Sequence, residues 1–356
     1  MSTGNDQSTN VAAAIDTRSD AIAQAAWEAL RINHANLDLR YGGNVQSVWR
    51  DHFAQRLSEL SVALASGDNR LFGERLAWAR SAMESRGLAT DDMEYSIAAL
   101  RSALGNTLDG PDNALAQACI DEAMQVVASD VKGLSESALD AGAPLDKLAL
   151  QYIQAVVAGN VTQAMQLILD AAERDISVSD AYLKVLLPAQ QEVGRLWHIN
   201  ALTVSEEHLV SHTTQRLMAA LAATATRAPD NGYTVVAGSV MGNSHDIGIR
   251  AIAYLMELDG WRTIYLGSDI PRDELPAALD GFEADVLMLS VALTSQIPET
   301  RKTIEEIRAQ GKHPVKILIG GNGLAGRGEL WKDLGADGSA RSANSALTKA
   351  LQLAQQ

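Results

Sequence analysis

Hydrophobic and polar positions repeat differently in the two halves of this chain. Up to about residue 225, apolar residues recur every three or four positions, as they do on one face of an α-helix. From Tyr233 onward, short apolar runs alternate with helical patterns, and such runs are typical of strands buried on both faces of a parallel sheet. We therefore expect a helical N-terminal half followed by an α/β domain.

The helical half divides into a tail and two predicted units. Residues 1–19 have little to bury, so we expect a disordered tail there. Residues 20–135 carry five helical patterns between turn signals, which predict an N-terminal helical domain. Residues 145–223 predict a second unit, in which Pro188 marks a kink or a fresh start. Its four helices are expected at residues 145–158, 161–174, 179–196 and 204–223.

Residues 233–356 repeat a strand and a helix five times. The apolar runs predict strands at residues 233–240, 263–266, 286–290 and 316–319, with a short fifth strand near Gly338. Helices are expected at residues 246–258, 272–279, 298–309, 325–334 and 344–353, and a loop at 267–271. The fold class is thus α/β plus all-α, with a flavodoxin-like (Rossmann-like) parallel sheet in the C-terminal domain.

Three of the predicted strands end in residues that suit a binding site. The first is followed by Gly242-Asn243-Ser244-His245-Asp246-Ile247-Gly248, the third ends at Ser290, and the fourth at Gly320-Gly321. The carboxyl ends of parallel strands meet at one edge of the sheet, where open α/β folds bind ligands. Alone, His245 would be an ordinary histidine on a surface loop, but the other two strand ends predict one pocket around it.

The spacing of these residues resembles the fingerprint of the cobalamin-binding domain of methionine synthase and its relatives: Asp-x-His-x-x-Gly, then Ser-x-Leu or Ser-x-Thr, then Gly-Gly. The resemblance implies that His245 is the lower axial ligand of cobalt, in place of the cofactor's own dimethylbenzimidazole. It also implies that the displaced nucleotide tail lies in a slot between the strands. The residues implied to contact the cofactor there are Gly248, Ser290, Gly320 and Gly321.

Two positions depart from this fingerprint. Asn243 stands where the family has Asp, and Ala292 stands two residues after Ser290. Asn243 is expected to accept a hydrogen bond from the second ring nitrogen of His245 and so to fix the tautomer of the ring. An amide carries no charge to strengthen the ligand, which weakens the case for methyl transfer more than the case for cobalamin binding.

A second motif lies in the helical unit before the α/β domain. Trp197-His198 is followed by Glu207-His208, and the spacing Trp-x9-Glu-His resembles the signature of adenosylcobalamin-dependent photoreceptors. That resemblance implies that residues 145–223 form a four-helix cap, with Trp197, Glu207 and His208 around the 5′-deoxyadenosyl group. It also implies that His198 binds cobalt from above once light has cleaved the cobalt–carbon bond. The alternative is that Trp197 fills the helical core and Glu207-His208 cap a helix.

These resemblances imply a light sensor that is not an enzyme. Such a protein binds adenosylcobalamin through His245 and changes conformation or self-association when light cleaves the cofactor. We therefore expect a homo-oligomer, a dimer in the first instance, and a downstream protein partner. Residues 20–135 lack a basic DNA-reading helix, so the whole chain resembles the photocobilins, which implies biliverdin as a second chromophore at that domain. A corrinoid methyl carrier for a methyltransferase and a plain cobalamin store remain as alternatives.

Composition excludes several other classes. A net charge of −15 over 356 residues argues against a nucleic-acid-binding surface. We find neither a signal-like N-terminus nor an apolar run of the roughly 18 residues that a membrane span needs. Cys119 is the single cysteine, so there is no intrachain disulfide, and we expect a cytoplasmic protein. Cys119 lies in a helical pattern and is expected to be buried, without a thioether to a bilin.

Overall fold

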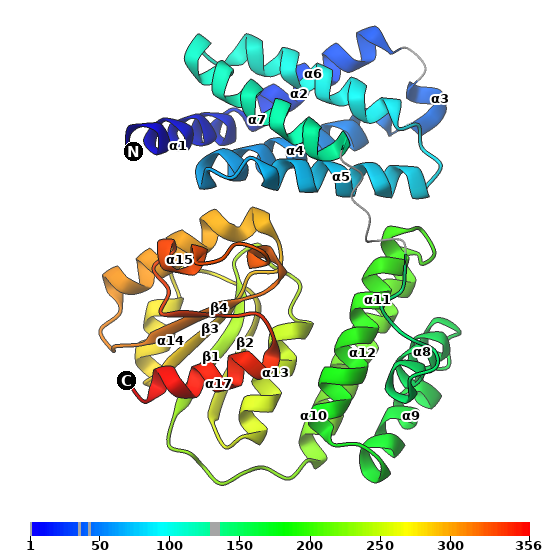
Figure 1. The fold of residues 1–356 in the computed structure, drawn as a ribbon, viewed down its shortest axis with the longest axis vertical. Coiled ribbons are helices and arrows are strands. Elements are labelled where there is room, and N and C mark those ends of the chain that lie inside the picture. The colour runs from blue at the N-terminus through cyan, green and yellow to red at the C-terminus, as the bar shows by residue number, and fades with distance from the viewer. Residues whose placement is uncertain (1, 35–36, 42–43, 129–135) are drawn as a thin grey trace. The chain divides into compact units, whose positions relative to one another are not determined.

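The computed structural model describes residues 2–34, 37–41, 44–128 and 136–356. By its internal contacts the chain divides into two compact units, Met1–Gly133 and Leu134–Gln356. The first unit is helical, and the second has a helical part and an α/β part (Figure 1). Among the described residues, no helix is both long enough and apolar enough to cross a membrane.

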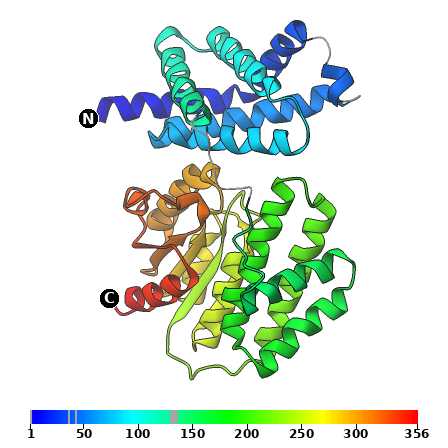
Figure 2. The same cartoon turned by 45° about the vertical axis from the view of Figure 1, so that its right-hand side comes forward.

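Helix α4 (Val45–Ser66) is at the centre of the first unit. Its residues Phe53, Leu57 and Leu60 share one helical face and are fully buried. The unit's other helices are α1 (Ser2–Thr17), α2 (Ser19–Asn33), α3 (Leu37–Tyr41), α5 (Arg70–Ser85), α6 (Asp91–Thr107) and α7 (Gly110–Ala128). α4 contacts α1, α2, α5 and α7, which makes this unit an all-α bundle (Figure 2).

The segment that was expected to be a disordered tail is helical. Its described part, Ser2–Thr17, forms α1, in which Val11 and Ile15 lie one turn apart and are fully buried. The Ser61 hydroxyl of α4 donates a hydrogen bond to the Ala12 carbonyl at 3.2 Å. The expectation was wrong because even a short apolar stripe is enough to dock a helix when a neighbouring helix offers a buried face.

The second unit begins with a group of helices that we call the cap, residues 144–224. These are α8 (Pro144–Val157), α9 (Val161–Arg174), α10 (Val178–Asp180), α11 (Leu187–His198) and α12 (Val204–Thr224). A π-helical turn, Ala181–Leu186, joins α10 to α11 and ends just before Pro188. Proline has no N–H to continue a regular helical ladder, and the wider turn accommodates it.

The α/β domain contains a parallel sheet with the strand order β2-β1-β3-β4-β5. The strands are β1 (Thr234–Val240), β2 (Arg262–Ile270), β3 (Val286–Ser290), β4 (Lys316–Gly320) and β5 (Gly338–Ala340), and the helices are α13 (Ile247–Leu258), α14 (Leu275–Phe282), α15 (Ile297–Gln310), α16 (Leu330–Asp333) and α17 (Ala343–Ala354). This order is that of the flavodoxin-like fold, so the predicted fold class is confirmed.

Two elements of this domain differ from the prediction. β2 extends to Ile270 through the expected loop, with register shifts where Gly267 and Asp269 take positive φ angles of 90° and 54°. The helix expected at 325–334 is reduced to α16. Gly326 and Gly328 take φ angles of 74° and 51°, which a right-handed helix does not allow.

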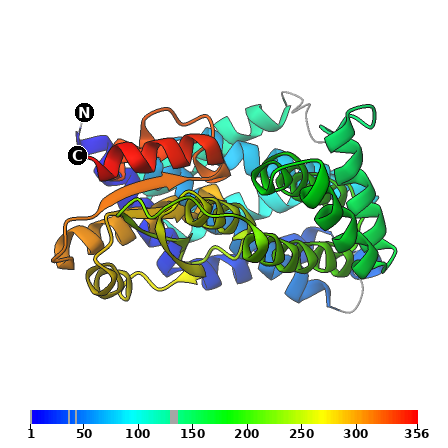
Figure 3. The same ribbon diagram turned by 90° about the horizontal axis from the view of Figure 1, so that it is seen from below.

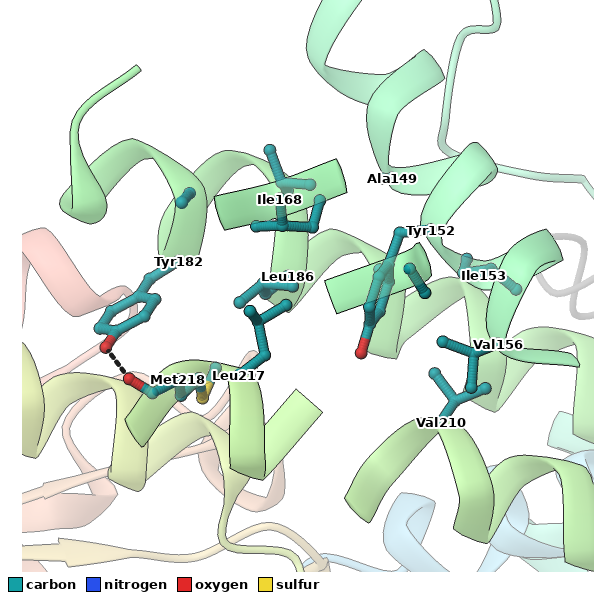
Figure 4. Packing of buried hydrophobic residues seen from close by; sticks show 14 of the residues in the cluster. Ala149, Tyr152, Ile153, Val156, Ile168, Tyr182, Leu186, Val210, Leu217 and Met218 are labelled. Carbon is teal, nitrogen blue, oxygen red and sulfur yellow. Dashed lines mark hydrogen bonds between the residues drawn. The ribbon is translucent and has the colours of Figure 1, made fainter. Parts of the chain in front are cut away.

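The cap packs directly on the α/β domain within the second unit. Its buried cluster includes Tyr152, Tyr182 and Leu217 (Figure 4). The cluster continues into α13 through Ala251 and Leu255. The views in Figures 1 and 3 show the cap helices grouped beside the sheet domain. On one face of the sheet, α13 and α17 cover the buried strand residues. The carboxyl ends of β3 and β4 therefore lie close to the cap and to α13 and α17.

Candidate functional site

The loop that carries His245 is fastened to the sheet by Asn243. This residue is fully buried, and its Nδ2 donates to the carbonyl of Ser290 at 3.0 Å. Its Oδ1 accepts a hydrogen bond from the backbone N–H of His245, also at 3.0 Å. The sequence led us to expect a contact with the ring of His245, but the amide instead shapes the backbone. The His245 side chain is left exposed at the sheet edge.

Gly242, the residue before Asn243, holds the same end of this loop through two further hydrogen bonds. Its N–H donates to Asp269 Oδ1 at 2.7 Å, and its carbonyl accepts from Gln296 Nε2 at 3.1 Å. Gly242 has a φ of 79°, a conformation that favours glycine. Sequence reasoning missed both Asp269 and Gln296. Asp269 lies in the sequence Gly267-Ser268-Asp269-Ile270-Pro271, which we interpreted only as a loop, whereas no pattern in the sequence marked Gln296.

Asp246 joins the same loop to the cap. Its carboxylate is buried and accepts hydrogen bonds from Tyr265 Oη and Arg250 Nη2, both at 2.6 Å. Gln215 Nε2 of α12 donates to its second oxygen at 3.1 Å. Burial, and then the hydrogen bond to Asp246, raise the pKa of Tyr265 well above its usual value, so its hydroxyl remains a donor. The residue beside His245 is thus held from three elements.

A cavity of about 170 Å³ opens at the ends of β3 and β4. Four of the predicted site residues line it together: Gly248, Ser290, Gly320 and Gly321. Its walls are mainly the apolar side chains of Ile249, Ile252, Met288, Leu289, Leu318 and Ile319. Leu187 of the cap and Arg341 also reach it. The structure therefore brings the three predicted strand ends to one slot with apolar walls, which suits a flat aromatic group.

The glycines that line this slot are needed for different physical reasons. A Cβ at Gly320 would lie 2.8 Å from the carbonyl oxygen of Ala340, and one at Gly321 would lie 2.3 Å from that of Val291. Gly321 also has a φ of 119°. At these two positions, glycine lets two segments of backbone lie close together. From the sequence, we had expected glycine there to let the cofactor lie close to the backbone. A Cβ at Gly248, in contrast, would meet nothing within 4 Å.

The residues of the second motif are spread over the surface and interior of the cap. Trp197 is half-buried near the end of α11, and the side chain of His198 is 2% exposed, inside the cap. His208 has 66% of its side chain exposed, and its Nδ1 lies 2.5 Å from Oε2 of Glu207. The structure therefore pairs Glu207 with His208, but it does not place His198 on the surface where an upper cobalt ligand would lie.

In the first unit, Cys119 is fully buried, as predicted. Burial raises the pKa of its thiol to about 12, so it is not a thiolate at neutral pH. A thiolate is the form that attacks a vinyl or other electrophilic group. This agrees with the expectation that Cys119 forms no thioether.

Comparison with known proteins identifies two domains in the second unit. A family model described as a B12 binding domain matches residues 233–348, and another of the same description matches residues 148–222. Dimethylamine corrinoid protein 3 of Methanosarcina mazei is 33% identical over 121 residues, which are 33% of this chain and 71% of that protein. Dimethylamine corrinoid protein 1 of Methanosarcina acetivorans is 26% identical over 213 residues, covering 57% and 97% of the two chains.

A solved structure, the monomethylamine corrinoid protein of Methanosarcina barkeri, is also similar. It has 18% identity and a TM-score of 0.48, and the match covers 58% of this chain and 98% of that one. The fold assignment rests on the sheet order seen in this chain.

The prediction of a light sensor is wrong. The relatives are named corrinoid proteins, which favours the alternative that the sequence left open, a methyl carrier. The error came from giving the three residues of Trp-x9-Glu-His more weight than two whole domains. Cobalamin as the cofactor is supported, but neither the adenosyl form nor biliverdin is supported by these relatives. The homo-oligomer and the cytoplasmic location stay predictions.

Proposed function

This chain belongs to the family of B12-binding corrinoid proteins, and on that premise we propose that it carries a methyl group on cobalamin for a methyltransferase system. The single observation that supports this proposal most is the convergence of an exposed imidazole and an apolar slot at one sheet edge. When bound, the cobalt of cobalamin accepts and releases the methyl group. The chain binds and orients the cofactor but is not itself the catalyst.

The donor set at this edge fits the cofactor. Cobalt in a corrin accepts an imidazole nitrogen, and His245 is exposed on a loop that Asn243 and Gly242 hold in place. We propose that His245 would bind the cobalt and that the cofactor's own base, once displaced, would be held in the 170 Å³ cavity. Ser290 is one of the polar residues that line that cavity, with Arg341 and Ser342, and its hydroxyl would donate a hydrogen bond to the base.

The amide at position 243 also suits this role. Nδ2 of Asn243 donates to the Ser290 carbonyl, which a carboxylate cannot do. Asn243 thus ties the ligand loop to the strand end that lines the slot. We propose that this chain holds His245 by a fixed loop backbone, whereas a carboxylate that contacts the ring would act through charge.

The partner follows from the same proposal. A carrier must offer the upper side of its cofactor to the proteins that give and take the methyl group. We therefore propose a methyltransferase as the protein partner, in place of the signalling partner that the light-sensor prediction required. The names of the relatives refer to dimethylamine, so a methylamine is the methyl donor to test first.

Binding measurements in the dark test the proposal. The full chain is titrated with methylcobalamin, adenosylcobalamin and hydroxocobalamin. The hydroxocobalamin complex is then reduced to cobalt(I) by a titanium(III) reductant and treated with methyl iodide, which transfers its methyl group and releases iodide. We expect the methyl form to bind at least as tightly as the adenosyl form, and the bound cofactor to be methylated without leaving the protein. A strong preference for adenosylcobalamin, with an elution volume that changes under green light, would contradict the carrier.

A further inference from the structure

A continuous row of hydrogen bonds runs through the cap from the Glu207-His208 pair to the buried Tyr152. Ser211 Oγ lies 2.6 Å from Glu207 Oε1 and 3.1 Å from Gln190 Oε1. Gln190 Nε2 lies 2.7 Å from Thr214 Oγ1, which lies 2.8 Å from Tyr152 Oη. These residues come from α8, α11 and α12, so the row crosses the cap. Gln190, Thr214 and Tyr152 belong neither to the motif around His245 nor to Trp-x9-Glu-His.

Helix α12 presents these residues on two neighbouring stripes. Glu207, Ser211 and Thr214 follow the helical repeat and point toward α11 and α8, because their partners lie there. His208, His212 and Gln215 form the adjacent stripe. Gln215 contacts Asp246, the neighbour of His245, and His208 lies about 10 Å farther along the helix axis at 1.5 Å per residue. His208 is therefore on the side of the cap that faces the cofactor site.

The number of available protons determines in which direction the hydrogen bonds of this row donate. The Ser211 hydroxyl has one proton but lies beside two acceptors, Glu207 Oε1 and Gln190 Oε1. Rotating the Gln190 amide by half a turn exchanges its oxygen and nitrogen without changing its shape. Tyr152 then donates to Thr214, Thr214 to Gln190, Gln190 to Ser211, and Ser211 to Glu207. The Thr214 and Ser211 hydroxyls each donate once and accept once, the Tyr152 hydroxyl donates, and every donor points toward the Glu207 carboxylate.

The buried end of the row, Tyr152, is a donor as well. Burial raises the pKa of Tyr152 to about 12, so the row begins with a protonated hydroxyl at neutral pH. The second carboxylate oxygen of Glu207, Oε2, takes no part in the row and lies 2.5 Å from His208 Nδ1. A carboxylate only accepts, so Nδ1 must carry the proton, and in the neutral ring Nε2 keeps its lone pair.

We propose that Ser211, Gln190, Thr214 and Tyr152 are positioning residues that hold Glu207 and thereby fix His208 as its Nδ1–H tautomer. The exposed Nε2 then accepts a hydrogen bond from an O–H or N–H donor at the upper side of the cofactor. This role rests on the proposed carrier function, in which that side exchanges its ligand. The donor is water when no methyl group is bound, or the group that delivers the methyl.

The tautomer is measured directly, without cobalamin. The full apo chain is labelled with ¹⁵N-histidine, and the ring nitrogens of His208 are assigned by comparison with His208→Gln. We expect wild-type His208 to carry its proton on Nδ1. Ser211→Ala should at least halve the population of that tautomer, because Glu207 loses its anchor. Ser211→Thr keeps the hydroxyl and should restore the wild-type spectrum.

Two buried tyrosines of the cap provide a matched control. Tyr182 is as buried as Tyr152, but its hydroxyl donates to the Met218 carbonyl, outside the row (Figure 4). Tyr152→Phe should shift the His208 ring signals, and Tyr182→Phe should leave them unchanged. A wild-type ring protonated on Nε2, or equal spectra for wild type and Ser211→Ala, would overturn the proposal. Because the apo chain is used, such a failure is separate from a failure of methyl transfer.

Discussion

The sheet edge around His245 and the surface of the cap around Glu207-His208 were both identified from short motifs, yet they differ in how the motif is built. At the sheet edge, residues distant in sequence converge on one loop and one slot. In the cap, the paired residues are sequence neighbours whose contacts lead away into the helical core. A motif spread over three strand ends is informative because only one fold brings those ends together. A motif along two helices is compatible with several functions.

The largest effect is expected at the sheet edge, from Asn243→Asp. This change places a carboxylate in a fully buried position and removes the donor to the Ser290 carbonyl. We expect the free energy of unfolding to fall by about 2–3 kcal/mol and cobalamin affinity to fall roughly tenfold to a hundredfold. Urea unfolding and a cobalamin titration measure the two effects. Tighter binding by the Asp variant would mean that charge on the ring matters more than the loop.

The glycines of the slot sharpen the comparison next. Gly321→Ala should destabilise the protein by about 2–3 kcal/mol, because its φ is 119° and its Cβ would meet the Val291 carbonyl. Gly248→Ala is the matched variant, since its Cβ meets nothing and alanine favours the helix that begins there. It should keep full thermal stability while weakening cobalamin binding. If binding by Gly248→Ala is normal, the cofactor does not approach this position.

A smaller effect is expected in the cap, from Glu192→Gln. The Arg195 guanidinium donates to both carboxylate oxygens of Glu192, at 2.6 and 2.9 Å, and lowers the pKa of that carboxyl. The folded-state pKa lies below the unfolded one, so the stabilisation is present at neutral pH and is lost as pH falls through the folded pKa. We expect the variant to lose about 1 kcal/mol at pH 7 and to match wild type in strong acid. Thermal melts across this pH range measure the difference, and a constant gap at all pH values would contradict it.

Much of the sheet domain could be predicted from the sequence, because β1, β3 and β4 are short apolar runs with clear ends. β3 was predicted to the residue, and Ser290, Gly320 and Gly321 were placed at one pocket. The cluster around Asp246 could not be predicted. It joins Gln215, Arg250 and Tyr265, whose approach depends on how α12 docks and on the register of β2.

The cap shows the opposite case. Its helices were predicted closely, but the orientation of its polar residues was not. The pattern Trp-x9-Glu-His does not reveal that His198 is buried or that Glu207 is held by Ser211. Helical periodicity predicts which face is apolar, but it does not predict which polar neighbours meet across three helices. For this reason the functional reading of the cap was the part of the prediction that failed.

The central claim is that His245 binds cobalt, and electron paramagnetic resonance of the full chain loaded with cobalamin and reduced to the cobalt(II) state tests it most directly. The protein is prepared with ordinary and with ¹⁵N-labelled histidine. If a histidine of the chain is the ligand, labelling changes the nitrogen splitting of the cobalt signal, and His245→Ala removes that splitting. A splitting that is the same with and without the label would show that the cofactor keeps its own base, which contradicts the account.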